Sequence, residues 1–177
     1  MKKIVLSALF VALAVAMGYL FLLIPNVEMI SATVFIAGAV VGARWGLLVG
    51  FVSELIFSLF NPMGAAAPPL LVAQLFCFMI IGFFGGLIGL PKQVKLWRFS
   101  LVCGLAGFFL TLLYDVLTTL SFALFIAGDD LRKLLTIFTA GAVFNATHSL
   151  INTIIFTIIV PAILIGIQRY QTSHVHA

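Results

Sequence analysis

Two carboxylates, Glu54 and Asp115, lie inside long runs of apolar residues. A charged group at the centre of a bilayer costs about 2.5–3.5 kcal/mol on insertion scales, so it normally faces a partner, a cavity or a ligand. No Lys or Arg lies at the depth that the sequence gives either residue, which makes an ion pair hard to build. We therefore expect each carboxylate to be protonated, to bond to His148 or a nearby amide, or to face a polar ligand.

Other polar residues accompany these carboxylates at helical spacing. Residues three, four or seven positions apart share one face of a helix, so each set should present its side chains together. The three sets are Glu54, Ser58 and Asn61; Thr111, Asp115 and Thr118, with Tyr114 and Thr119 alongside; and Asn145, His148 and Asn152.

We take most of these side chains, with Gln74 and two polar residues of the first loop, as candidate substrate-binding groups. The alternative is that they bind neighbouring helices, a role in which an intramembrane polar side chain contributes about 0.6 kcal/mol on average. The candidates are Asn26, Glu28, Glu54, Asn61, Gln74, Tyr114, Asp115, Thr118, Asn145, His148 and Asn152.

The composition places these residues in a membrane protein. Of the 177 residues, 64% are hydrophobic and 8% are charged, whereas a soluble domain carries roughly a quarter charged residues. Lipid-exposed backbone must satisfy its own hydrogen bonds, and the apolar runs are long and continuous, so the fold class should be all-α. The net charge of +4 comes from scattered basic residues, which gives no support to nucleic-acid binding.

The length accommodates six helices of about 20 residues in one membrane domain, residues 1–177. The run from Met29 to Phe60 is too long for one crossing, so we expect a break near Gly42 to Gly46, with both pieces short enough to be partly re-entrant. We expect the first apolar run to be retained as a span, because it exceeds a signal-peptide core. The predicted spans are 4–23, 29–41, 46–60, 70–90, 99–126 and 141–167.

The basic residues give the orientation. With both termini in the cytoplasm, seven basic residues lie inside, and only Arg132 and Lys133 lie outside. The seven are Lys2, Lys3, Arg44, Lys92, Lys95, Arg98 and Arg169. This orientation puts nearly all the candidate polar groups in the middle or outer half of the membrane. The sequence therefore predicts a polar pocket that opens outward above closely packed apolar helices.

Small residues follow one face of the first span, where Ala8, Ala12 and Ala16 recur every four positions. Such a stripe lets two helices approach closely in lipid. Glycines of the fourth span favour packing within the chain.

Enzyme functions are disfavoured, because no HExxH motif or P-loop occurs and Ser149 adjoins His148 on the same helix. We expect no metal and no cofactor, and any energy from ATP must come from another polypeptide.

The six spans, the outward pocket and the Ala-xxx-Ala pattern at Ala8 to Ala12 resemble the substrate-binding S components of energy-coupling factor (ECF) vitamin transporters. The likeness covers nearly the whole chain and includes the loop from Pro25 to Glu28. It implies a multi-pass protein of a prokaryotic cell membrane that captures a vitamin or vitamin precursor outside. It also implies that the alanine stripe docks on a transmembrane coupling subunit, which two cytoplasmic ATPases drive.

Two other functions remain open from the sequence. Asp115 or Glu54 would cycle a proton in a self-sufficient secondary transporter, which needs no ATPase. A structural membrane subunit would hold the same polar groups as helix contacts and bind no solute.

Overall fold

The computed structural model describes residues 2–91, 95–128 and 130–175, and within these ranges every regular element is a helix. The all-helical prediction is therefore confirmed. The helices are α1 (Lys2–Phe21), α2 (Ile30–Val41), α3 (Ala43–Leu59), α4 (Pro68–Ile88), α5 (Leu96–Ala127) and α6 (Leu131–Val175). Lys92, one of the basic residues expected on the cytoplasmic side, lies outside the described residues.

Four helices, α1, α4, α5 and α6, are long and apolar enough to cross a membrane. Large apolar side chains are exposed along them, among them Leu20 on α1 at 70% and Phe109 on α5 at 61%. Exposure on this scale would be unfavourable in water and is normal for a surface that faces lipid. The chain is a membrane protein.

The expected break in the run from Met29 to Phe60 occurs at Gly42, which separates α2 from α3. Its φ of +97° lies in the region that side chains with a Cβ rarely adopt, so glycine permits the sharp reversal. The 12 residues of α2 extend only about 18 Å, less than the ~30 Å hydrocarbon core. Nearly all of α2 is buried, and it forms the centre of the bundle.

Glycines bring the hairpin of α2 and α3 into backbone contact with α4. A Cβ atom on Gly82 of α4 would lie 2.0 Å from the carbonyl oxygen of Gly46, and one on Gly38 would lie 2.0 Å from that of Gly82. No side chain fits at such distances. Gly82, Gly85 and Gly86 therefore pack within the chain, as expected, whereas Gly89 ends the helix and meets no atom within 4 Å.

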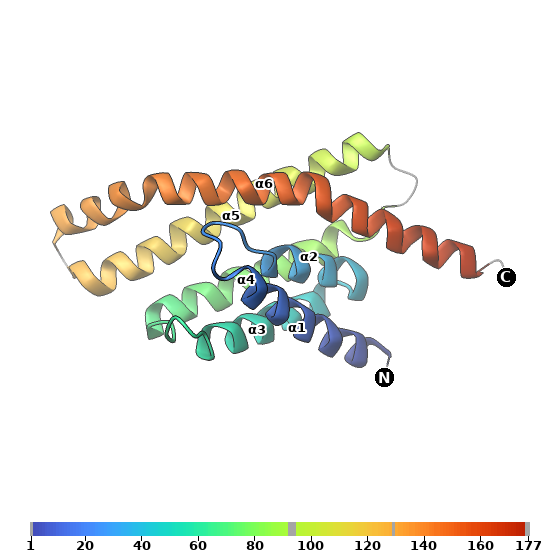
Figure 1. Cartoon of the computed structure of the whole chain (residues 1–177), viewed down its shortest axis with the longest axis horizontal. Helices are drawn as coiled ribbons and strands as arrows, with labels where there is room; N and C mark the ends of the chain where they lie inside the picture. Colours follow the sequence, from blue (N-terminus) through green and yellow to red (C-terminus); the bar gives the residue numbers. More distant parts are fainter. Residues whose placement is uncertain (1, 92–94, 129, 176–177) are drawn as a thin grey trace.

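The last helix differs most from its predicted span. It begins at Leu131, well before the predicted start at Gly141, and continues past Ile167. Pro161 lies inside it and is fully buried. A proline removes one backbone hydrogen bond and bends a helix, and the C-terminal part of α6 runs at an angle to the rest (Figure 1).

The arrangement has two parts, with α1 to α4 packed together and the α5–α6 hairpin lying along them (Figure 1). Both ends of the chain lie at the same end of the bundle, opposite the α5–α6 turn. The loop between α1 and α2 folds back across the bundle instead of projecting from it. Residues of this loop and of all six helices line the polar site.

Candidate functional site

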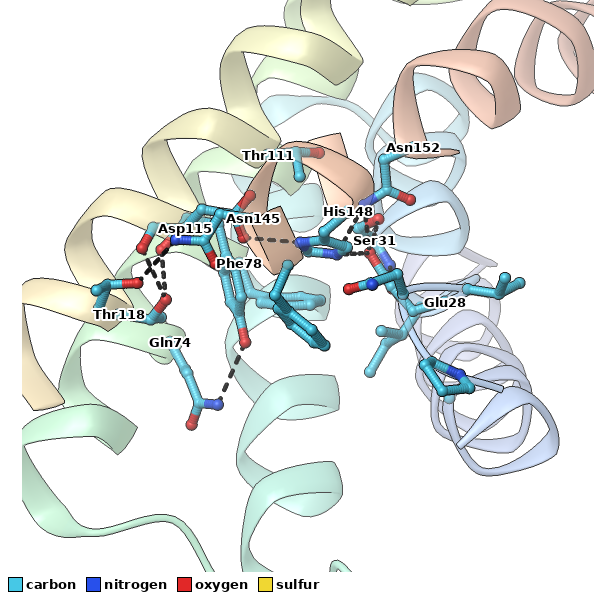
Figure 2. Close-up of a pocket in the computed structure, with 18 of the residues that line it drawn as sticks. Glu28, Ser31, Gln74, Phe78, Thr111, Asp115, Thr118, Asn145, His148 and Asn152 are labelled. Carbon is cyan, nitrogen blue, oxygen red and sulfur yellow. Dashed lines mark hydrogen bonds and ion pairs between the residues drawn. The ribbon is translucent and has the colours of Figure 1, made fainter. Parts of the chain in front are cut away.

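A cavity of about 710 Å³ lies between the two parts of the bundle, and all six helices and the first loop contribute to its wall. Figure 2 shows its polar side chains converging from α2, α4, α5, α6 and the first loop. Ten of the eleven predicted substrate-binding residues line it. They are Asn26, Glu28, Glu54, Gln74, Tyr114, Asp115, Thr118, Asn145, His148 and Asn152.

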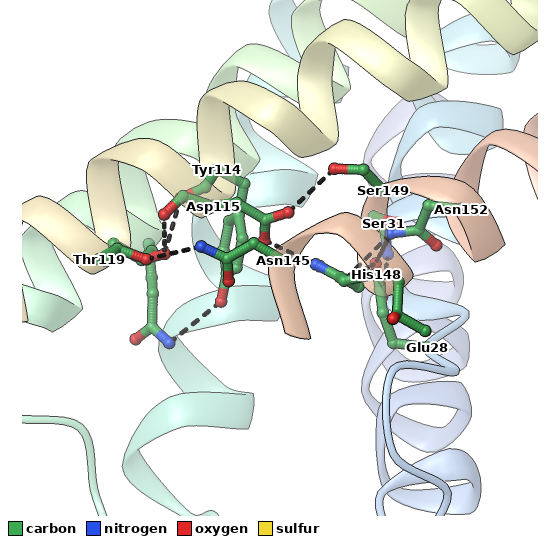
Figure 3. A network of polar contacts seen from close by, with 12 residues as sticks. Glu28, Ser31, Tyr114, Asp115, Thr119, Asn145, His148, Ser149 and Asn152 are labelled. Atoms are coloured by element: carbon green, nitrogen blue, oxygen red, sulfur yellow. Dashed lines mark hydrogen bonds and ion pairs between the residues drawn. The ribbon is translucent and has the colours of Figure 1, made fainter. Parts of the chain in front are cut away.

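Asp115 joins α5 to α6 at the centre of the site. Its Oδ1 atom lies 2.7 Å from Nδ1 of His148, and its Oδ2 atom accepts a hydrogen bond of 3.0 Å from the Ser149 hydroxyl. Both partners are neighbours on α6, so one carboxylate holds two consecutive side chains (Figure 3). The sequence suggested that His148 bonds to Asp115 or Glu54, and the structure places it against Asp115. Although His148 and Ser149 are consecutive on one helix, both side chains reach Asp115.

The first loop contributes Glu28, which lines the cavity and reaches α6. Its Oε2 atom accepts the backbone N–H of Ser31 at 3.0 Å, and its Oε1 atom accepts the Ser31 hydroxyl and, at 3.1 Å, the Asn152 amide. The Nε2 atom of His148 lies 4.0 Å from the same Oε1 atom. These contacts tie the loop and the start of α2 to α6.

Asn26, also in the loop, adopts a φ of +60°, a left-handed conformation that Asn tolerates better than most residues. Its buried Oδ1 atom has no hydrogen-bond partner among the described residues.

Glu54 occupies the opposite side of the cavity on α3. It is 1% exposed, and its Oε1 atom accepts a hydrogen bond of 2.7 Å from the Ser58 hydroxyl one turn later. The Ser58 hydroxyl also lies 3.2 Å from Oε1 of Gln74, whose amide donates to the Tyr114 hydroxyl at 3.2 Å. The second carboxylate oxygen of Glu54, Oε2, has no hydrogen-bond partner within the described part of the chain.

Two further candidates lie toward the α5–α6 turn. The Asn145 amide donates to the Thr119 hydroxyl at 3.1 Å and joins the two helices. The Thr118 hydroxyl bonds to the backbone carbonyl of Tyr114 at 2.7 Å, within its own helix.

Asn61 is the candidate that the cavity does not include. The sequence placed it on the same helical face as Glu54 and Ser58, but α3 ends at Leu59, so the helical spacing does not continue to it. Its side chain accepts the backbone N–H of Met63 at 2.9 Å and stabilises a turn instead.

Sequence reasoning missed several members of the site. Ser31 and Ser149 were not candidates, and Thr119 was placed beside Asp115 but not among the binding groups, although each bonds to a lining side chain. A serine or threonine in an apolar helix can bond to its own backbone, so its presence alone gives little signal. The remaining wall is mostly apolar and includes Phe57, Phe78 and other residues without any polar spacing to reveal them.

The alanine stripe of α1 points away from the cavity. Ala8, Ala12 and Ala16 are exposed, whereas Ser7, Ala14 and Gly18 of the same helix are buried against the bundle. The small residues of α1 thus form one internal face and one external face.

The chemistry of the cavity is that of a binding site. Three carboxylates line it, and no described Lys or Arg does. No group of three or more His, Cys, Asp or Glu side chains that could hold a metal ion occurs among the described residues. A mainly apolar wall with a few convergent polar groups is typical of sites that bind small molecules.

Comparison with known proteins gives one match. No curated protein and no solved structure is significantly similar to the chain. The family model described as "ECF transporter, substrate-specific component" matches residues 2–164, which is most of the chain. The resemblance drawn from the residues is therefore confirmed. The chain belongs to the family of substrate-specific components of ECF transporters.

Proposed function

We propose that this protein captures a small vitamin or vitamin precursor on the extracellular side and delivers it inward as the specificity subunit of an ATP-driven importer. Family membership makes it a substrate-specific subunit of an ECF transporter and implies association with a coupling subunit and ATPases. The identity of the solute, the direction of transport and the residues that bind it are our proposal. The observation that carries it is the cavity of buried polar groups where the two parts of the bundle meet.

The ten lining candidates form the proposed binding site. Asp115 and His148 are held by each other and by neighbouring side chains, so they would meet a solute in a fixed geometry. Preorganised polar groups lose little conformational entropy on binding, which favours affinity. Glu28 and Asn26 would close the site from the loop side.

The proposed orientation puts both termini in the cytoplasm of a prokaryotic cell and counts six crossings, with α2 and α3 as a short pair. Both ends of the chain lie at one end of the bundle, which is consistent with an even number of crossings. The seven basic residues assigned to the cytoplasmic side favour that end as the inner one. The cavity would then open outward.

The exposed stripe of Ala8, Ala12 and Ala16 is the proposed surface for the coupling subunit. Its side chains are too small to cover the α1 backbone, so a partner helix could approach closely. The internal contacts of α1 use the other small residues, so the stripe is not needed for folding.

Reconstituted transport tests the proposal. The chain would be placed in liposomes with or without a coupling subunit and its ATPases, and offered a mixture of labelled soluble vitamins and precursors. We expect one compound to accumulate only when the ATPases are present and supplied with ATP. Uptake driven by a pH gradient without ATPases would instead identify a proton-coupled transporter and refute the proposal.

A further inference from the structure

The hydrogen bonds around the cavity leave an imbalance between donors and acceptors. The amides of Asn152, Asn145 and Gln74 donate to Glu28, Thr119 and Tyr114. The hydroxyls of Ser31, Ser58 and Ser149 are directed to carboxylates. Many of the donors at the wall are thus used within the protein.

The buried side-chain atoms of the wall that have no partner among the described residues are oxygens. Three side-chain oxygens of lining residues are buried and have no hydrogen-bond partner among the described residues: Oε2 of Glu54, Oδ1 of Asn26 and Oδ1 of Asn152. A buried acceptor without a partner costs about 1–3 kcal/mol, and more if it is charged. A solute that donates hydrogen bonds would remove this cost on binding.

The ionisable side chains of the cavity wall also favour a solute that donates hydrogen bonds. Glu28, Glu54 and Asp115 line the cavity, and His148 is the one described side chain of its wall that can carry a positive charge near neutral pH. Asp115 has His148 and Ser149 as partners, and Glu28 has Ser31 and Asn152. Among the described residues Glu54 has one hydrogen-bond partner, the Ser58 hydroxyl, so it has the fewest partners of the three carboxyl groups.

We infer that the cavity selects a small amphipathic solute with a basic, N–H-donating nitrogen, such as an amine, an amidine or an aminoheterocycle, on an apolar or aromatic body. This inference rests on the proposed function and narrows its substrate class. The nitrogen donates to Glu54 and the neighbouring free oxygens, and the body packs against Phe57, Phe78 and the other apolar wall residues. A solute whose polar group is a carboxylate or phosphate would face three carboxylates and no Lys or Arg.

Binding by the purified full-length chain in lipid nanodiscs tests this class. The panel contains pyridoxamine, pyridoxine and 4-pyridoxate, which carry an aminomethyl, a hydroxymethyl and a carboxylate group on one ring system, together with thiamine, biotin and pantothenate. A small-molecule extract of bacterial cells extends it. Retained compounds are identified by mass spectrometry, and their affinities are measured by thermal shift and titration.

We expect the retained compound to carry a basic nitrogen, and Glu54→Gln to weaken its binding at least about tenfold, as the loss of a charged hydrogen bond should. Glu54→Gln keeps the size of the side chain and should leave the ligand-free melting temperature unchanged or higher, because the amide oxygen can still accept the hydrogen bond from the Ser58 hydroxyl. Asp130→Asn is the matched control, since Asp130 is an exposed acid outside the cavity.

The opposing results separate the two proposals. Tighter binding of pyridoxine or 4-pyridoxate than of pyridoxamine, retention of another compound that lacks a basic nitrogen, or equal affinity in the Glu54→Gln variant would overturn the substrate class and leave solute capture intact. If the folded wild-type chain retains nothing from the panel or the extract, solute capture itself is refuted, and with it the inferred class.

Discussion

At the scale of residues, Asp115 is the group on which the site depends most. It holds His148 at 2.7 Å and Ser149 at 3.0 Å, and it is 4% exposed. Removal of either member of the Asp115–His148 pair leaves the other buried without its partner, at a cost of about 1.5–3 kcal/mol. Asp115→Ala and His148→Ala should each weaken solute binding at least about tenfold, measured by titration of the copurifying compound.

Thr147→Ala is the control for these variants. Thr147 precedes His148 on α6 but is exposed, and its hydroxyl bonds to the backbone carbonyl of Val143. Its loss should leave affinity within error of wild type. Equal affinity in the Asp115→Ala and wild-type proteins would remove Asp115 from the site.

Helical spacing predicted most of the polar residues that meet in the cavity, because polar groups in an apolar helix must share a face that avoids lipid. It failed for Asn61, where the helix stops before the pattern is complete. It also gave no sign that Glu28 reaches α6, since the path of a loop depends on tertiary contacts such as the one with Asn152.

At the scale of elements, the contact of α4 with the α2–α3 hairpin is set by glycine. Gly82→Leu should destabilise the fold by about 1–3 kcal/mol or prevent folding, because a Cβ there would lie 2.0 Å from the backbone of Gly46. The fraction of monodisperse protein and its thermal unfolding measure the effect. Gly166→Ala is the matched control, since a Cβ at Gly166 meets no atom within 4 Å, and it should be neutral or stabilise by about 0.5–1 kcal/mol. A stable Gly82→Leu protein would contradict the packing.

A separate prediction concerns the exposed alanine stripe of α1. Ala8→Trp and Ala12→Trp should preserve solute binding and abolish ATP-driven uptake, because the bulky ring keeps the coupling subunit away from an exposed stripe. Leu13→Trp is the control: Leu13 is also exposed, but it points about 100° away from Ala12 around the helix. Normal uptake by the alanine variants would show that the coupling subunit docks elsewhere.

The sequence predicted the number and order of the helices better than it predicted their lengths. Apolar runs separated by Pro and Gly marked the six elements, and the break at Gly42 was visible because one helix from Met29 to Phe60 would be too long for the membrane. The early start of α6 was not visible, because Leu131 to Ala140 is neither apolar enough to extend a span nor rich in residues that stop a helix.

At the scale of the whole molecule, capture of a solute from outside requires that the cavity opens away from the cytoplasm. The distribution of basic residues predicts this orientation, and both chain ends lie at the end of the bundle opposite the α5–α6 turn. The sequence predicts a direction because the prediction depends only on counted charges. It could not supply the shape of the cavity, which depends on how the loop and the hairpin pack.

The labelling of single cysteines in intact cells tests the central claim most directly. Thr119 lines the cavity, and Thr172 is exposed near the C-terminal end of α6. The native Cys77 and Cys103 are buried and should give little background. With a membrane-impermeant thiol reagent, we predict that Thr119→Cys is labelled from outside and Thr172→Cys only after the membrane is permeabilised. The opposite pattern would contradict capture of a solute from the extracellular side.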